Sequence, residues 1–153
     1  MKHLIFIFLL FPLLLTSQDQ SMIDSLKTVL EKSDNDSIKT MLLINIGNQY
    51  IKWDYEEANQ NFKKALSFAL KSNSKTLQAQ SLISIGIIHR KQGKYNIALQ
   101  FFEKALKIRE EIGDKKKVAI TLLHIAILHS SQGKREKAMK YQQQALEVRK
   151  DNN

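Results

Sequence analysis

Few residues of this 153-residue chain are of types that could bind a metal ion or catalyse a reaction. The absence of cysteine excludes disulfides, thiolate-bound zinc, iron–sulfur clusters and thiol catalysis. His124 and His129 are five residues apart, which places them about 140° apart around a helix, so they cannot share one ion. The sequence also lacks HExxH, a phosphate-binding glycine loop, a nucleotide fingerprint and a Ser/His/Asp set. We therefore expect no metal, no cofactor, no catalytic residues and no enzymatic activity.

Side chains that could bind another protein recur along three predicted helices. In the second of these helices, one face is expected to meet the next helix, and it holds Leu82, Ile85, Gly86 and His89. The residues on the opposite face form a second stripe along the helix. The candidate residues on this stripe and on its counterparts are Ile44, Asn45, Asn48, Ile83, Ser84, Ile87, Arg90, His124 and Ile127.

The charge balance limits the partners. The chain has 24 basic and 15 acidic residues, for a formal net charge of +9. A basic excess is common in nucleic-acid-binding proteins, but the run Lys115–Lys117 falls in the expected first turn of a helix. Cations oppose the helix dipole there, so the run is better explained as a solvated turn. We expect a protein or peptide partner, and no nucleic acid.

The helices belong to a repeat with a period of 40 residues. Alanines mark this spacing at Ala58, Ala98 and Ala138, and again at Ala65, Ala105 and Ala145. The first helix of the first repeat lies 39 residues before its counterpart, so we expect its turn, around Trp53, to be one residue shorter than the turn at Gly93. Such internal repetition is typical of solenoid proteins.

Helical periodicity and turn residues predict seven helices, over about 21–32, 37–52, 55–72, 75–92, 94–112, 115–132 and 134–150. Gly113-Asp114 and Asn73-Ser74 are each typical of a helix end followed by the N-cap of the next helix. Asp36 is the expected cap of the helix over 37–52.

These residues resemble the tetratricopeptide repeat, whose pattern runs W-x2-L-G-x2-Y and then A-x3-F. The glycine position holds Gly47, Gly86 and Ala126, and the phenylalanine position holds Phe62 and Phe102. The family's terminal proline is missing, and the 40-residue period is similar to that of kinesin light chains and bacterial sensory repeat proteins. The resemblance covers about 37–150 and implies an all-α, right-handed superhelical solenoid of about seven antiparallel helices.

The start of the chain is typical of a secretory signal peptide. Lys2 precedes an apolar stretch from Leu4 to Leu15. Twelve helical residues reach about 18 Å, less than the roughly 30 Å of a bilayer core, which favours cleavage over retention as a membrane anchor. We therefore expect export to the periplasm or envelope, with no membrane span in the mature protein. The expected parts are a signal peptide over 1–18, a capping helix over 21–34 and repeats over 37–74, 75–114 and 115–150.

The resemblance implies that the candidate stripe lines the concave groove of the solenoid and binds a peptide. Asn45 would bind the peptide backbone, because its amide both donates and accepts, and Arg90 would pair with an acidic side chain. The alternative is that Ile44, Ile83, Leu123 and Ile127 pack against neighbouring first helices, and the sequence does not decide between the two.

Two roles are consistent with this architecture. The first is a non-catalytic scaffold that binds proteins in the cell envelope. The second is a sensory input module, stand-alone or truncated, of a bacterial histidine kinase or regulator system, because the leader and repeats resemble the extracytoplasmic part of such kinases. The polar run Gln142–Gln144 in the last repeat is typical of a terminal cap, so we expect a complete small protein. The sequence indicates neither the partner nor the oligomeric state.

Overall fold

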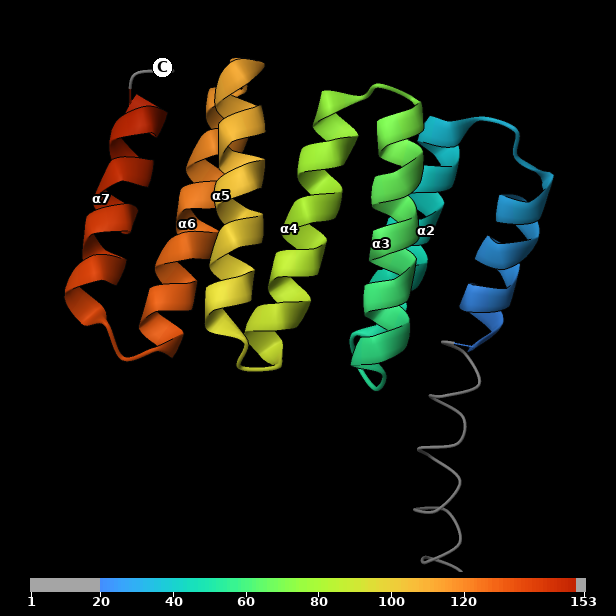
Figure 1. The fold of residues 1–153 in the computed structure, drawn as a ribbon, viewed down its shortest axis with the longest axis horizontal. Helices are drawn as coiled ribbons and strands as arrows, with labels where there is room; N and C mark the ends of the chain where they lie inside the picture. The colour runs from blue at the N-terminus through green and yellow to red at the C-terminus, as the bar shows by residue number, and fades with distance from the viewer. Residues whose placement is uncertain (1–19, 151–153) are drawn as a thin grey trace, which may run out of the picture.

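The computed structural model describes residues 20–150, which form seven helices joined by short turns (Figure 1). A helix over residues 20–32 comes first. The six that follow are α2 (Asp36–Tyr50), α3 (Tyr55–Lys71), α4 (Lys75–Lys91), α5 (Tyr95–Glu111), α6 (Lys115–Ser131) and α7 (Arg135–Lys150). None of the described residues lies in a strand, so the predicted all-α class is confirmed. The predicted signal peptide over residues 1–18 lies outside the described residues.

The helices stand side by side in a row that runs from residues 20–32 at one end to α7 at the other (Figure 1). α2 with α3, α4 with α5, and α6 with α7 form three antiparallel pairs, one for each predicted repeat. Neighbouring pairs meet where α3 contacts α4 and where α5 contacts α6. At the start of the row Ile23 is fully buried, and Lys27 Nζ donates to the Tyr50 hydroxyl at 3.3 Å. Within residues 20–150, no helix is both long enough and apolar enough to cross a bilayer.

The turns between helices use the residues that the sequence indicated. Gly113 has a φ of +71° and Asn73 a φ of 52°, in the left-handed region that ends helices. The next residues, Asp114 and Ser74, cap the following helices by accepting hydrogen bonds from backbone N–H groups at 3.0 and 3.4 Å. Each of these two junctions between repeats therefore ends one helix and starts the next within three residues.

The predicted cap of α2 was wrong by one residue. The Oδ1 atom of Asn35 accepts a hydrogen bond from the backbone N–H of Ile38 at 3.0 Å, which makes Asn35 the N-cap. Asp36 is instead the first residue of the helix, where its negative charge complements the helix dipole.

The first turn of the array is also different from the prediction. Residues 51–54 connect α2 to α3, whereas the Gly93 turn needs only residues 92–94, so the first turn is longer and not shorter. None of residues 51–54 has a positive φ, and the backbone N–H groups of Trp53 and Asp54 both donate to the carbonyl of Tyr50, at 3.1 and 2.8 Å. The first repeat is one residue shorter than the second because α2 ends early, and not because its turn is short. The turn itself is longer, because a turn without a left-handed residue needs more chain.

Close contact between paired helices depends on the glycine position. A Cβ atom at Gly86 would lie 2.5 Å from Cε1 of Phe102, and one at Gly47 would lie 2.5 Å from Cε1 of Phe62. Both phenylalanine rings are fully buried, so the paired helices touch through ring and backbone. In the third repeat Ala126 takes the glycine position, and its Cβ is tolerated because Gln142 replaces the phenylalanine.

Candidate peptide-binding face

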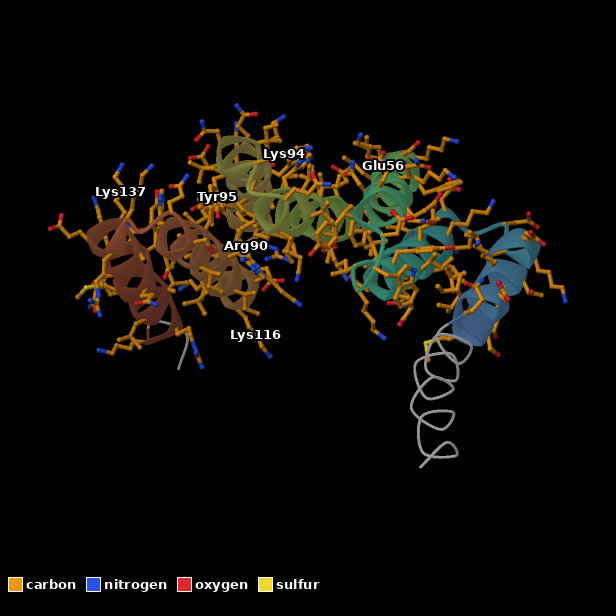
Figure 2. The ribbon with its side chains drawn as sticks, turned by 90° about the horizontal axis from the view of Figure 1, so that it is seen from below. Glu56, Arg90, Lys94, Tyr95, Lys116 and Lys137 are labelled. Atoms are coloured by element: carbon orange, nitrogen blue, oxygen red, sulfur yellow. The ribbon has the colours of Figure 1, made fainter. Side chains whose placement is uncertain are left out.

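The row of helices bends into an arch, and α2, α4 and α6 lie on its inner side (Figure 2). Seen along the helices, α3 and α5 lie on the outer side, while Arg90 and Lys116 lie on the inner side (Figure 2). The predicted candidate residues all belong to α2, α4 and α6. All nine therefore come from the inner row of helices.

The candidate residues differ in how accessible they are. Asn45, Asn48 and Ile127 are exposed, and the structure gives the two amides no hydrogen-bond partner within residues 20–150. Three more are half-buried: Ile87, Arg90 and His124. These six are available, at least in part, to a partner on the inner side of the arch.

The other three candidates are covered by the neighbouring repeat. Ile44 is 3% exposed and packs in a cluster that includes Ile85 and Ile88 of α4. Ile83 is 6% exposed and packs with Ile125 and Leu128 of α6. Ser84 is also buried. The two isoleucines therefore pack between the first helices of adjacent repeats, as the alternative to a peptide groove predicted, and do not face solvent.

Acidic side chains are missing from the inner helices. α4 and α6 contain neither aspartate nor glutamate, and α2 contains only Asp36, in its first turn. The acidic residues of the repeats lie instead on the outer helices and in the turns, for example Glu56 and Glu57 of α3. The helices of the inner side therefore carry an excess of positively charged side chains, which attracts negatively charged groups.

Arg109, a buried residue of α5 that bonds to α6, was not predicted from the sequence. It lies near the end of α5 and is 7% exposed, and its Nη1 atom donates to the Lys117 carbonyl at 3.0 Å and to Thr121 Oγ1 at 2.6 Å. These bonds tie the second repeat to the third. Burial lowers the pKa of Arg109, while the carboxylate of Asp114 acts in the opposite direction.

His124 lies on α6 one turn after Thr121, the residue that binds Arg109. Its ring stacks on Phe102, with the ring centroids 5.6 Å apart and the planes 22° from parallel. Burial lowers the pKa of His124 below its ordinary value, and the positive charges of Arg109 and Arg90 lower it further. The ring is therefore neutral at pH 7 in the free protein.

The other two histidines within residues 20–150 pack against aromatic rings. His89 stacks on Phe101 with centroids 5.5 Å apart, and His129 stacks on Tyr141 at 5.4 Å. Burial, followed by the charges of Lys94 and Lys63, lowers the pKa of His89. In the part of the chain that the structure describes, no three histidine, aspartate or glutamate side chains gather where they could hold a metal ion.

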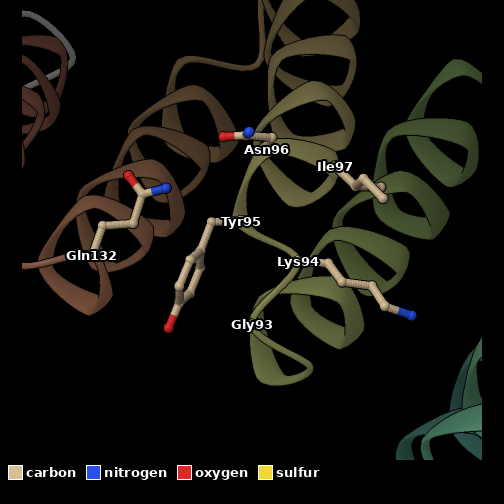
Figure 3. A pocket seen from close by; sticks show the side chains of 6 residues that line it. All are labelled: Gly93, Lys94, Tyr95, Asn96, Ile97 and Gln132. Carbon is tan, nitrogen blue, oxygen red and sulfur yellow. The ribbon is translucent and has the colours of Figure 1, made fainter.

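A hollow of about 440 Å³ lies at the α4–α5 turn, away from the candidate residues (Figure 3). It is lined by Gly93, Lys94, Tyr95, Asn96, Ile97 and Gln132. The side chains point in different directions and do not converge on a common point (Figure 3). A small-molecule site needs convergent polar groups, so this hollow is a surface feature of the turn.

Comparison with known proteins matches this arrangement to a family. The model of the tetratricopeptide repeat matches residues 76–151, which contain the second and third helix pairs. Residues 76–151 therefore belong to the tetratricopeptide repeat family. α2 and α3 form a third pair outside this match, and Gly47 contacts Phe62 there as Gly86 contacts Phe102 in the second repeat. No curated protein matches the chain in sequence.

Solved structures of tetratricopeptide repeat type share the fold. Aspartyl phosphate phosphatase F from Bacillus subtilis is 20% identical over 90% of this chain, with a TM-score of 0.79. BtubC (BKLC) from P. vanneervenii is 16% identical over 90% of the chain, with a TM-score of 0.76. The TPR domain of Arabidopsis FLU is 22% identical over 77% of the chain and 99% of that domain, with a TM-score of 0.67. The chain spans 37% of the phosphatase and 59% of BtubC, and these similarities establish the fold alone.

Proposed function

We propose that this tetratricopeptide repeat protein binds a segment of another protein along the inner side of its arch, without catalysing a reaction. The observation that carries the proposal is the composition of that face. Asn45 and Asn48 present unpaired amides, while Met41, Ile120 and Ile127 leave aliphatic surface exposed. An amide can bind a peptide backbone as donor and acceptor, and aliphatic side chains accept the apolar residues between.

The groove is tested by a variant that carries Asn45→Ala and Arg90→Glu. We expect it to lose most of the partners that the wild-type chain captures from an envelope fraction, because it loses one backbone contact and reverses one charge. The control carries Glu57→Ala and Lys137→Glu, which are exposed residues of α3 and α7. If the first variant captures the same partners as wild type, the groove proposal is wrong.

We further propose that the protein works outside the cytoplasm, which the composition of residues 1–18 supports. The expected result is a mature chain that begins near Gln18 or Asp19 and is recovered in the envelope or periplasmic fraction. Mass spectrometry of the purified protein measures its N-terminus, and a Leu9→Arg variant, which interrupts the apolar stretch, should remain unprocessed. A full-length chain in the cytoplasmic fraction of wild-type cells would contradict export.

A sensory input module is the second candidate. It is supported by the resemblance of the leader and repeats to the extracytoplasmic part of repeat-containing histidine kinases. A kinase or regulator gene adjacent to this one would favour sensing, and capture of a structural envelope protein by the inner face would favour the scaffold.

A further inference from the structure

We propose that His124, stacked on Phe102 between Arg90 and Arg109, forms a proton-linked subsite for a carboxylate side chain of the bound partner. The inference rests on the proposed function and adds the chemistry of the partner, which is an acidic segment that also carries aliphatic side chains. Three observations support the subsite: the stacking of His124 on Phe102, the two arginine charges that act on His124, and the absence of acidic residues from α4 and α6.

The position of the His124 ring is fixed by the scaffold. Phe102 is fully buried against Gly86, and His124 stacks on that ring from α6. The histidine is only half-buried, so part of the ring remains accessible. Ile120 and Ile127 lie one turn before and after it on α6 and are 37% and 47% exposed. A polar position is therefore flanked by two aliphatic positions on the same helix face.

The charges that act on His124 come from the elements packed around it. Arg109 of α5 is held beside α6 by its bonds to Thr121 and the Lys117 carbonyl. Arg90 reaches the region from α4, and its Nε atom is buried without a hydrogen-bond partner among the described residues. α7 packs elsewhere on α6, where Tyr141 stacks on His129. The rest of Arg90 is half-buried, so its positive charge acts on a carboxylate beside His124 although Nε itself is covered.

Charge complementarity identifies the ligand class. Because α4 and α6 lack acidic residues, an incoming carboxylate meets no like charge on either helix. A basic segment would place cations against Arg90 and Arg109, where repulsion disfavours binding. The partner is therefore acidic at the position that meets His124 and aliphatic at the positions that meet Ile120 and Ile127.

Binding of a carboxylate is coupled to a proton. In the free protein burial and the two arginines keep the pKa of His124 low, so the ring is neutral near pH 7. A carboxylate beside the ring raises that pKa, because it favours the charged form. The complex then takes up a proton, and affinity increases as the pH falls through the pKa of the complex. The gain ends below the pKa of the free protein, where His124 is already protonated.

The test uses two synthetic amphipathic peptides of about sixteen residues, a length that spans the inner helices as one segment. Both carry the same isoleucine and leucine positions, with glutamate at every polar position of one and glutamine in the other. Each is titrated into the ¹⁵N-labelled mature chain at low salt and followed by NMR. We expect the glutamate peptide to bind at least about tenfold more tightly, to shift amide signals of α4 and α6, and to raise the pKa of His124 read from its ring protons.

Variants assign the effect to the subsite. His124→Gln should abolish the increase in affinity between about pH 7.5 and pH 6, and Arg90→Gln should weaken binding of the glutamate peptide. Lys137→Gln is the matched control, because it removes the same charge from α7, away from Arg90 (Figure 2). Thermal unfolding of each variant checks that it is folded, and the peptide comparison with the wild-type chain requires no variant.

Each alternative outcome has a defined meaning. Equal affinity of both peptides for α4 and α6 would overturn the subsite but leave the proposed groove intact. Binding of the glutamate peptide to the outer helices would contradict both. Absence of binding by either peptide at millimolar concentration, or an unchanged pH dependence in His124→Gln, would overturn the subsite.

Discussion

Replacement of Phe102 by alanine is expected to destabilise the protein by about 3–5 kcal/mol, the usual cost of removing a buried phenylalanine. The ring is fully buried in the middle repeat, where it lies against the backbone of Gly86 on one side and His124 on the other. The other buried residues of its own helix in this cluster, Ala98 and Ala105, are too small to fill the space. The loss therefore includes both the transfer of the ring to water and the cavity that remains.

Urea unfolding followed by circular dichroism measures this loss. Gln142→Ala is the matched control, since Gln142 holds the same position in the third repeat but is exposed, and its replacement should change stability by no more than about 0.5 kcal/mol. A Phe102→Ala variant within about 1 kcal/mol of wild type would show that the ring does not hold the central hairpin together.

The sequence predicted the scaffold well because the scaffold depends on local signals. Helix ends at Asn73 and Gly113 follow from residues that tolerate a positive φ, and the contact at Gly86 follows from its phase in the repeat. The first turn is the exception. The 39-residue offset of the first helix showed that the first repeat is one residue shorter than the second. It did not show which part is shorter, because a helix can end earlier as readily as a turn can shorten.

The exposure of the candidate face was predicted less well because burial there depends on neighbouring repeats. Ile44 and Ile127 share the same kind of helix stripe, but α4 covers Ile44 whereas Ile127 is 47% exposed. The helical angle of a residue fixes its direction but not how closely the next first helix approaches. The packing alternative therefore holds for Ile44 and Ile83, whereas Ile127 is exposed and its place in a binding groove stays a prediction.

Arg109 could not be recognised from the repeat pattern alone. The same position holds Ala69 in the first repeat and Arg149 in the third, so the residue types give no consistent signal. Its bond to Thr121 Oγ1 joins residues on two different helices, a contact that the repeat pattern does not encode. This tie also fixes one of the two charges beside His124, which links the stability of the array to the chemistry of the inner face.

Replacement of Gly86 by leucine is expected to destabilise the protein by about 1–3 kcal/mol through overpacking. Even the first atom of the new side chain would lie 2.5 Å from the Phe102 ring, which is fully buried and cannot move into solvent. The control is Gln80→Leu, which adds the same side chain at an exposed position of α4 and should have little effect. Melting curves of the two variants and wild type give the comparison, and an unchanged curve for Gly86→Leu would exclude close helix contact there.

Alanine at the same position separates contact from helix propensity. In an exposed helix, exchange of glycine for alanine gains up to about 1 kcal/mol, so a net loss in Gly86→Ala requires a steric cost larger than this gain. The cost should shrink when Phe102 is first replaced by leucine, because the smaller side chain leaves space for the Cβ atom. The third repeat already carries such a combination, with Ala126 opposite Gln142. Additive effects of the two substitutions would contradict the contact, since residues that touch show coupled free energies of unfolding.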